Sequence, residues 1–162
     1  MKNKKRIIGV DPGTRITGYG IIEANRNSYD LICHGTITPS IKLAQEFRYL
    51  AIFEELQKII EEYEPQELSV ETQFVYKNVD SALKLGMARG VIILAATLKK
   101  IPVFEYAPKK TKMAVTGTGS ASKEQVQKMI ELLLSEKVTS EDASDALALA
   151  ICHAHYRKLT YV

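Results

Sequence analysis

The chain has 162 residues, of which 46% are hydrophobic and 25% are charged, and its formal net charge is +3. These values exclude a chain that is disordered throughout and suit one globular domain over residues 1–162 with a sizeable core. No apolar run comes near the roughly 20 residues that cross a bilayer, and the basic start lacks a signal-peptide pattern. We therefore expect a cytoplasmic protein with no membrane segment.

Three strands are predicted at the start of the chain. Residues 6–10 are apolar and rich in β-branched side chains, which is typical of a buried strand. The turn sequence DPG separates them from a second strand over residues 16–24, and a third strand is expected over residues 28–39. The short connections predict a three-stranded antiparallel meander.

A helix is predicted over residues 41–63, because apolar side chains recur there at three- and four-residue steps. The Glu64-Pro65 pair then ends the pattern. A fourth strand follows over residues 67–72, and a second helix over residues 79–98. Small residues in this second helix predict close packing against a neighbouring element. They are Ala82, Gly86, Ala88 and Gly90.

A fifth strand is expected over residues 101–106, and the lysine-rich segment 107–120 follows it with no regular structure predicted. Two helices complete the chain, over residues 120–134 and 140–158, with capping or acidic residues at their starts. The order is β-β-β-α-β-α-β-α-α, and strands separated by helices run parallel. The sequence thus predicts an α/β fold with a five-stranded mixed sheet and helices on both faces.

Charge is unevenly distributed along the chain. Between Glu54 and Glu71 there are seven acidic residues and one lysine, whereas between Lys99 and Lys128 there are seven lysines and two glutamates. A basic region apart from an acidic one indicates a surface for a polyanion. Solvated helix faces would give the same pattern, and the charges alone do not separate the two interpretations.

Cysteine and histidine give no sign of a catalytic centre. Cys33 and Cys152 are far apart and lack metal-site spacing, so we expect reduced side chains in a cytosolic protein. Neither Cys33 nor Ser81 has an evident His/Asp partner, which argues against a protease-like triad. His153 and His155 are two residues apart on a helix and do not share a face, so surface or packing roles are expected.

Four carboxylates stand out by their positions. Asp11 ends the first strand, Glu71 ends the fourth, and Asp142 and Asp145 share one face at the start of the last helix. The first and fourth strands are expected to be neighbours, so Asp11 and Glu71 can meet at one end of the sheet. Each acid alone has an ordinary explanation as a turn, surface or capping residue, but together the four predict a cluster.

A cluster of carboxylates is costly without cations, because like charges raise one another's pKa. Hard divalent cations with oxygen ligands relieve the repulsion, and Mg²⁺ is the expected ion. Two such ions, about 3.5–4 Å apart, form the kind of site that cleaves phosphodiesters. The sequence therefore predicts a metal-dependent phosphodiester hydrolase.

The stretch DPGTRITG within the opening hairpin also resembles the first phosphate loop of the sugar kinase, actin and Hsp70 ATPase superfamily. Proteins of that superfamily hold the nucleotide between two such domains, and this chain has the length of one. No second hairpin of this type is found. The glycines are instead expected to let the hairpin bend and a DNA backbone approach closely.

Five ordered motifs resemble the RuvC family of Holliday junction resolvases, from about Ile7 to about His155. They are GVDPGTRITGYGII, VETQFVYKNVDSALKLGMARGVIILAA, PVFEYAPKKTK, GTGSASKEQVQKMI and DASDALALAICHAH. The resemblance implies a ribonuclease H-like fold and a Mg²⁺-dependent endonuclease, with Mn²⁺ as a substitute. It also implies a homodimer that makes paired symmetric nicks in four-way DNA junctions, leaves 5′-phosphate and 3′-hydroxyl ends, and works with the RuvA–RuvB branch-migration complex.

Asp11, Glu71, Asp142 and Asp145 fall on the acidic positions of the family, which implies that they are catalytic metal ligands. Phe74 matches an aromatic residue that the family places against bases at the junction. Stacking of this kind tolerates any base sequence, since every base has a π face. A core position is the alternative role for Phe74.

Lys112 and Lys123 match basic positions that the family associates with DNA and catalysis. Lys77 and Arg15 are further candidates for phosphate contacts. The helix that contains SALKLGMARG is the expected dimer region. Two alternatives stay open at this point, a non-catalytic nucleic-acid-binding module and a ribonuclease H-type enzyme that cuts RNA–DNA hybrids.

Overall fold

The computed structural model describes residues 4–72 and 78–160, with side chains described up to residue 157. One five-stranded sheet runs through the molecule in the order β3-β2-β1-β4-β5. The β1–β2 and β2–β3 pairs are antiparallel, and the β1–β4 and β4–β5 pairs are parallel. The strands are β1 (Lys5–Asp11), β2 (Thr17–Ala24), β3 (Tyr29–Ile37), β4 (Glu67–Glu71) and β5 (Val103–Tyr106).

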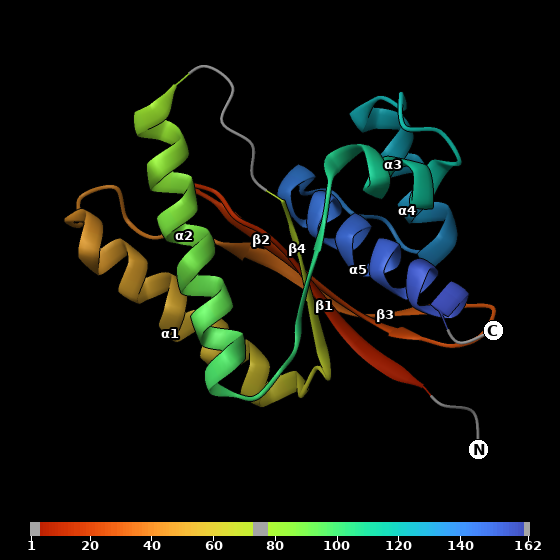
Figure 1. Ribbon diagram of the computed structural model, residues 1–162, viewed down its shortest axis with the longest axis horizontal. Helices are drawn as coiled ribbons and strands as arrows, with labels where there is room; N and C mark the ends of the chain where they lie inside the picture. The colour runs from red at the N-terminus through yellow and green to blue at the C-terminus, as the bar shows by residue number, and fades with distance from the viewer. Residues whose placement is uncertain (1–3, 73–77, 161–162) are drawn as a thin grey trace.

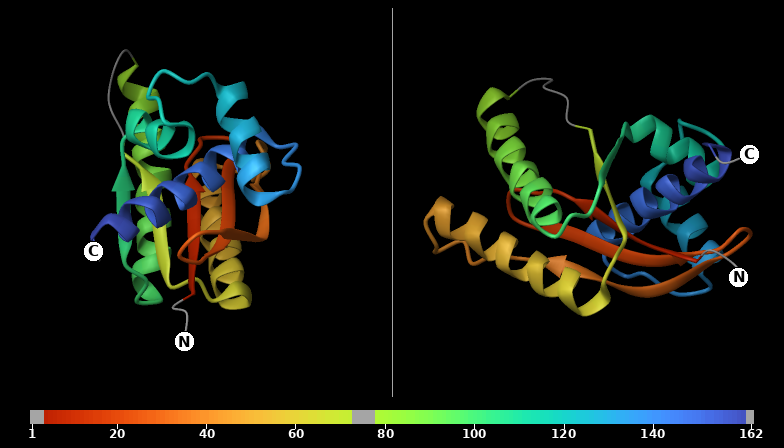
Figure 2. Two further views of the ribbon diagram at one scale, coloured as in Figure 1. Left: turned by 90° about the vertical axis from the view of Figure 1, so that its right-hand side faces the viewer. Right: turned by 60° about the horizontal axis from the view of Figure 1, so that its bottom comes forward.

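Helices cover both faces of the sheet. In Figure 1, α1 and α2 lie to one side of the strands and α3, α4 and α5 to the other. Figure 2 shows α5 crossing the strands on one face, with α1 and α2 behind them. The helices are α1 (Gln45–Tyr63), α2 (Val79–Leu98), α3 (Pro108–Thr116), α4 (Lys123–Leu134) and α5 (Glu141–Thr160). The predicted mixed sheet with helices on both faces is confirmed.

Alternating side chains of the central strands supply both cores. Ile7 and Ile22 belong to the apolar cluster beneath α4 and α5. Ile8 and Ile21 belong to the cluster beneath α1 and α2. All four side chains are fully buried. Successive residues of a strand point to opposite faces, so an unbroken apolar run is required wherever helices cover both faces.

Glycines on β1 and β2 let α5 lie directly against the sheet. A Cβ at Gly9 would lie 1.9 Å from the Ala146 carbonyl oxygen, and one at Gly18 would lie 2.1 Å from that of Asp142. Gly20, paired with Gly9 across the strands, lies against Leu147. The expectation that these glycines admit a DNA backbone is therefore wrong for all three, because α5 occupies the space.

The expectation of an irregular segment over residues 107–120 is wrong for most of its length. Pro108–Thr116 forms α3, with proline at its first turn and Gly117 at its end with φ 82°. Proline at the start and glycine at the end are the usual boundaries of a helix. The lysines that marked the segment project from α3, while Thr111 and Val115 are buried. The full order is therefore β-β-β-α-β-α-β-α-α-α.

The first helix is shorter than predicted. It begins at Gln45 rather than residue 41, and its C-terminal cap, Glu64, adopts a left-handed conformation. Only the second half of its apolar pattern reaches the core, through Ile52, Leu56, Ile59 and Ile60. Phe47 and Leu50 are exposed. The early part of the pattern thus marks a surface rather than the core.

The second helix bears on the expectation about membrane segments. By length and composition alone, Val79–Leu98 is the one helix in the described part of the chain that could cross a membrane. In the fold it packs on α1 and the sheet through buried Ile92, Ala95 and Ala96. The prediction that the small residues of this helix pack closely against a neighbouring element is confirmed for Ala88, which is buried. It is wrong for Gly90, which faces open space.

A buried polar network lies where β4 begins. His153 Nε2 is 2.9 Å from Glu67 Oε2, and His153 Nδ1 is 2.7 Å from the Tyr106 hydroxyl. Arg157 pairs with the other Glu67 oxygen at 3.0 Å. His153 is 2% exposed, so of the two expected roles it has the packing one. Both Cys33 and Cys152 are free, as expected.

Candidate active site

Two strand ends bring Asp11 and Glu71 to the same edge of the sheet. β1 and β4 pair in parallel up to Val10 and Val70, and each carboxylate residue follows directly. The carboxyl ends of parallel strands meet at one edge, which is where α/β proteins place their sites. The predicted adjacency of the first and fourth strands is confirmed.

The start of α5 brings Asp142 and Asp145 to this edge. Ser140 caps the helix, because its hydroxyl accepts a hydrogen bond from the Ala143 N–H at 3.2 Å. The backbone of Asp142 lies against Gly18, and Gly18 pairs with Asp11 across the β1–β2 ladder. The first turn of α5 is thereby placed beside the end of β1.

The charges of the four carboxylates act on one another. Burial raises the pKa of Asp11 to about 7, and the charges of Asp145, Glu71 and Asp142 contribute to this rise. The pKa values of Glu71 and Asp145 are also raised, chiefly by burial. Shifts of this kind, in carboxylates from three separate elements, mark a candidate functional site.

Two lysines oppose this negative charge. Lys123, at the start of α4, lies 3.2 Å from Glu141 Oε1 and 3.8 Å from Asp145 Oδ2. Lys112, on α3, acts to lower the pKa values of both Glu71 and Asp145. The structure therefore brings both predicted lysines to the carboxylates, from the two helices that follow β5.

The donor chemistry of this edge fits a divalent cation. Four carboxylates supply hard oxygen donors only, and at Asp11, besides burial, the charges of three carboxylates raise the pKa while Lys123 lowers it. Among the described residues, however, no group of three or more His, Cys, Asp or Glu side chains is arranged so that it could hold a metal ion. The four carboxylates thus fit a divalent cation by their donor type and their charge, and not by a preformed coordination geometry.

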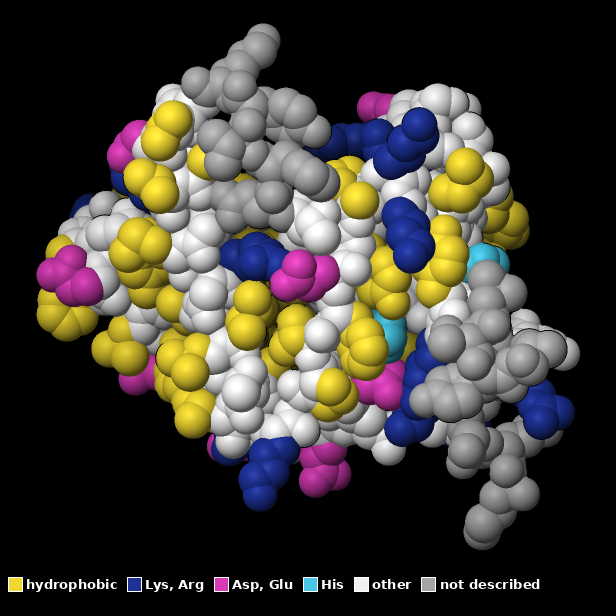
Figure 3. Space-filling view, viewed as in Figure 1, with side chains coloured by type: hydrophobic (Ala, Val, Ile, Leu, Met, Phe, Trp, Pro, Cys, Tyr) yellow, Lys and Arg dark blue, Asp and Glu magenta, His cyan; other side chains and the backbone are white. Residues whose placement is uncertain are grey.

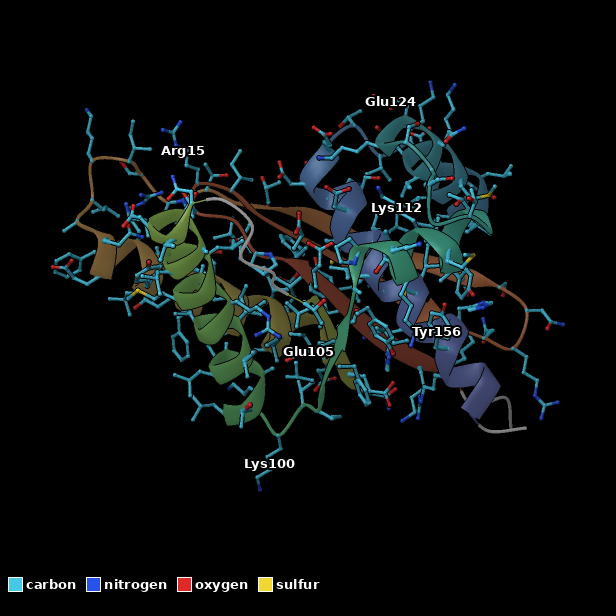
Figure 4. All side chains as sticks on the ribbon, turned by 45° about the horizontal axis from the view of Figure 1, so that its top comes forward. Arg15, Lys100, Glu105, Lys112, Glu124 and Tyr156 are labelled. Carbon is cyan, nitrogen blue, oxygen red and sulfur yellow. The ribbon has the colours of Figure 1, made fainter. Side chains whose placement is uncertain are left out.

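The remaining predicted DNA contacts are placed only in part. Arg15 is exposed on the turn between β1 and β2. In Figure 4 it lies toward α2, whereas Lys112 lies toward α3 and α5. Phe74 and Lys77 lie outside the described residues.

Two arginines near the site were not predicted from the sequence. Arg89 on α2 donates from Nε to the carbonyl oxygen of Glu71 at 3.1 Å. Arg48 on α1 donates to the carbonyl oxygen of Thr14, in the turn after Asp11. An arginine on an amphipathic helix looks like a solvent charge in a sequence, so only the fold reveals these contacts with the backbone.

Comparison with known proteins decides the family. The family model described as crossover junction endodeoxyribonuclease RuvC matches residues 7–153. The chain belongs to the RuvC family. A relative of that name from Protochlamydia amoebophila is 51% identical over 156 residues, which cover 95% of this chain and 93% of the relative. One from Hydrogenovibrio crunogenus is 47% identical over 160 residues, covering 98% and 92%.

Solved structures agree with this assignment. The structure "T. thermophilus RuvC in complex with Holliday junction substrate" matches with a TM-score of 0.91 and 29% identity, covering 96% of each chain. A yeast mitochondrial Holliday junction resolvase, at 12% identity and a TM-score of 0.69, shares the fold. The chain is therefore a nuclease of the RuvC family with its ribonuclease H-like fold, as the sequence motifs predicted.

Proposed function

We propose that this protein resolves four-way Holliday junctions by paired symmetric nicks during DNA recombination and repair. The observation behind this proposal is that Asp11, Glu71, Asp142 and Asp145 share one edge of the sheet, where burial and the charges of the other three raise the pKa of Asp11. RuvC of T. thermophilus was solved in complex with a Holliday junction substrate, which supports the same substrate here. Membership in the RuvC family favours this function over a hybrid-cutting nuclease or a non-catalytic binding module.

The proposed reaction is hydrolysis of one phosphodiester in each of two strands. An oxygen from water bonds to phosphorus, and the bond from phosphorus to the 3′ oxygen breaks. The 3′ oxygen leaves with a proton, so the products are a 5′-phosphate and a 3′-hydroxyl. The four carboxylates are proposed to hold two Mg²⁺ ions, or Mn²⁺ in their place, which when bound activate the water and stabilise the leaving oxygen.

The protein's own part is to position oxygen donors and to balance charge. Asp11 and Glu71 are held by the ends of paired strands, and Asp142 and Asp145 by a capped helix. Lys123 and Lys112 reduce the repulsion at Glu71 and Asp145. A phosphate brought to this edge would meet these positive charges beside the carboxylates.

The DNA is proposed to lie over the face that bears α3 and α4. Lys112 and Lys123 project from these helices, and Figure 3 shows Lys and Arg side chains gathered over this part of the surface. Arg15 and Lys77 are proposed as further phosphate contacts. Phe74 is proposed to stack on a base at the junction.

A second copy of the chain is the proposed partner of α2. The helix exposes Leu83, Met87, Leu94 and Leu98, and Figure 3 shows hydrophobic side chains gathered over α1 and α2. Gly90 leaves room for close approach, since nothing lies within 4 Å of a Cβ there. Isologous pairing of this face would give a two-fold dimer with two active sites, which suits symmetric nicks in a nearly two-fold junction.

The RuvA–RuvB branch-migration complex is proposed as a further partner, on the strength of the family resemblance. A cytoplasmic location without membrane attachment is proposed on the same ground. The two free cysteines are compatible with a reducing compartment.

Strand-mapped cleavage of a mobile four-way junction tests the proposal. With Mg²⁺ we expect symmetric nicks in two opposite strands, with ends that DNA ligase can seal. A plain duplex and an RNA–DNA hybrid of equal length serve as comparison substrates. Preferred cleavage of the hybrid, or no nicking of any branched substrate, would contradict the proposal.

The Asp11→Asn variant tests the metal assignment. It should lose cleavage while it keeps junction binding, because one ligand is lost and repulsion from DNA phosphates is reduced. Gel-shift titration and cleavage are measured on the same junction. If the variant still cuts with Mg²⁺, Asp11 is not a required ligand.

A further inference from the structure

Glu71 lies at the end of β4, where it is paired with a neighbouring strand on one side only. The β1–β4 pairing stops at Val10 and Val70, one residue before it. On the other side, the Thr72 N–H still donates to the Tyr106 carbonyl oxygen at 2.9 Å. On the β1 side Glu71 lies beyond the last ladder pair, so the orientation of its main-chain carbonyl depends on whatever else binds that oxygen.

Arg89 of α2 supplies that contact. Its Nε donates to the Glu71 carbonyl oxygen at 3.1 Å, and its Nη2 lies 2.5 Å from Glu105 Oε1 on β5. Glu105 lies in register with Val70, and Figure 4 shows it between α2 and β5. The planar guanidinium thus reaches the ends of two neighbouring strands with donors whose relative geometry is fixed.

We infer that Arg89 is a positioning residue for the Glu71 carboxylate, an inference that rests on the proposed role of Glu71 as a metal ligand. The guanidinium of Arg89 fixes the main-chain carbonyl of Glu71. The side chain of Glu71 points into the acidic edge. Glu105 orients the guanidinium in turn. Displacement of a catalytic group by about 1 Å can cost on the order of a hundredfold in rate, so support of this kind has a measurable effect.

A direct contact between Arg89 and DNA phosphate is the competing role. The structure argues against it, because the Arg89 side chain is 19% exposed and two of its nitrogens already have protein acceptors. Exposed Arg15 differs in this respect, since it stands on an outer turn. A phosphate-binding arginine would also contribute to the salt dependence of junction binding.

The test compares Arg89→Gln, Arg89→Lys and Glu105→Gln with the wild-type chain. We expect Arg89→Gln to lower the single-turnover rate of junction cleavage about tenfold or more, with the junction dissociation constant and its salt slope within twofold of wild type. The cleavage rate of Arg89→Lys should lie between those of Arg89→Gln and the wild-type chain, because one ammonium cannot bind both acceptors with the geometry of the guanidinium. Glu105→Gln should lower the cleavage rate about threefold, since the guanidinium of Arg89 keeps its contact with the Glu71 carbonyl.

A metal readout without DNA accompanies these rates. Mn²⁺ raises the unfolding temperature of a protein whose folded state binds it, and the midpoint of that rise reports affinity. We expect the Mn²⁺ midpoint of Arg89→Gln to increase about fivefold or more. Glu61→Gln is the matched control, because it removes the carboxylate of another ion pair, with Lys99, far from the strand end. It should change neither the rate nor the midpoint.

Three outcomes would overturn the inference. One is wild-type cleavage and a wild-type Mn²⁺ midpoint in Arg89→Gln. Another is a lower unfolding temperature as its sole change, which would make the role merely structural. The third is weaker junction binding with a smaller salt slope, which would assign Arg89 to DNA. Failure of the wild-type chain to cut any junction would instead refute the proposed function, and the DNA-free Mn²⁺ comparison would still decide the role of Arg89.

Discussion

The individual residue with the most unusual electrostatics is Asp11. Its pKa of about 7 results from burial and from three other carboxylates, with Lys123 opposing them. The folded chain therefore holds this proton more tightly than the unfolded chain does. The resulting stabilisation is fully present below about pH 4 and is lost as the pH rises through about 7. Negative charge at this edge thus costs stability at neutral pH, where the proposed site would need it.

Asp11→Asn should reverse this cost. In EDTA at pH 8 we expect the variant to unfold about 2–4 °C higher than wild type, the shift that roughly 1 kcal/mol gives in a chain of this size. The difference should vanish near pH 4. Thermal melts at both pH values measure it, with exposed Glu136→Gln as the control that changes neither. Equal melting temperatures at pH 8 would contradict the raised pKa.

The affinity for the metal ion should change over the same pH range as the protonation of Asp11. It should rise with pH, whereas the stability contributed by the bound proton falls. A cation competes with the proton on Asp11, so the Mg²⁺ concentration for half-maximal cleavage should fall as the pH rises from 6 to 8. Cleavage titrations at fixed ionic strength measure this. A requirement for Mg²⁺ that is constant over this range would show that Asp11 does not compete for the ion.

At the scale of elements, β4 carries carboxylates with two different functions. Glu67 at its start accepts a hydrogen bond from His153, and an ionised carboxylate can only accept, so His153 Nε2 carries the proton. Nδ1 then accepts from the Tyr106 hydroxyl. Burial lowers the pKa of His153, which favours this neutral form. Glu71 at the other end of β4 has carboxylate neighbours instead.

The two glutamates should therefore separate stability from activity. Glu67→Gln should lower the free energy of unfolding by about 3 kcal/mol, because it disturbs a buried ion pair, and should leave the cleavage rate near wild type. Glu71→Gln should reduce cleavage at least a hundredfold and leave stability unchanged or slightly higher. Urea unfolding and junction cleavage are measured on both variants. Loss of activity in a folded Glu67→Gln would contradict this division.

The contact between α5 and the sheet depends on glycine. Gly9→Ala would place a methyl group against the backbone of Ala146 and Ala150, and neither can retreat without moving α5. We expect a loss of about 2–4 kcal/mol, in the range of strained core substitutions. Gly90→Ala, measured in a chain that also carries Leu83→Glu to keep it monomeric, is the control: its methyl group meets open space on a helix and should gain about 0.5–1 kcal/mol. Urea unfolding of the two variants should give changes of opposite sign.

For the whole molecule, the arrangement separates an apolar surface from a basic one. The apolar side chains lie over α1 and α2, and the lysines lie over α3 and α4 (Figure 3). The sheet edge with the four carboxylates lies between these two helical groups. This order suits a dimer joined through one group, with DNA bound along the other.

Leu83→Glu tests this division of the surface. Leu83 is 65% exposed on α2, and a charge in a dimer interface is costly to bury, so sedimentation should shift from dimer to monomer. Paired nicks should become single nicks in the same preparation. Leu132→Glu is the control, because Leu132 is 72% exposed on α4 and should keep the wild-type state. An unchanged dimer in Leu83→Glu would place the interface elsewhere.

Much of the fold followed from local patterns. Apolar runs predicted the strands, and three- and four-residue periodicity predicted α1 and α2, because covered faces impose these periods on any chain. The beginning of α1 and the whole of α3 did not follow from them. At the start of α1 the apolar side chains lie on a surface, and in α3 the charged ones do. The proline that begins α3 and the glycine that ends it are also common turn residues.

The sequence by itself singled out the four carboxylates, because residue type and position at an element's end are local properties, and its resemblance to the RuvC family singled out Lys112 and Lys123. The tertiary structure decided what surrounds them. Only the fold shows that Gly9 and Gly18 make room for α5, that Glu67 contacts His153 and Arg157, and that Arg89 holds the carbonyl of Glu71. These contacts join residues far apart in the chain, such as Gly9 and Ala146, which are 137 positions apart, and no local pattern encodes a distance of that kind.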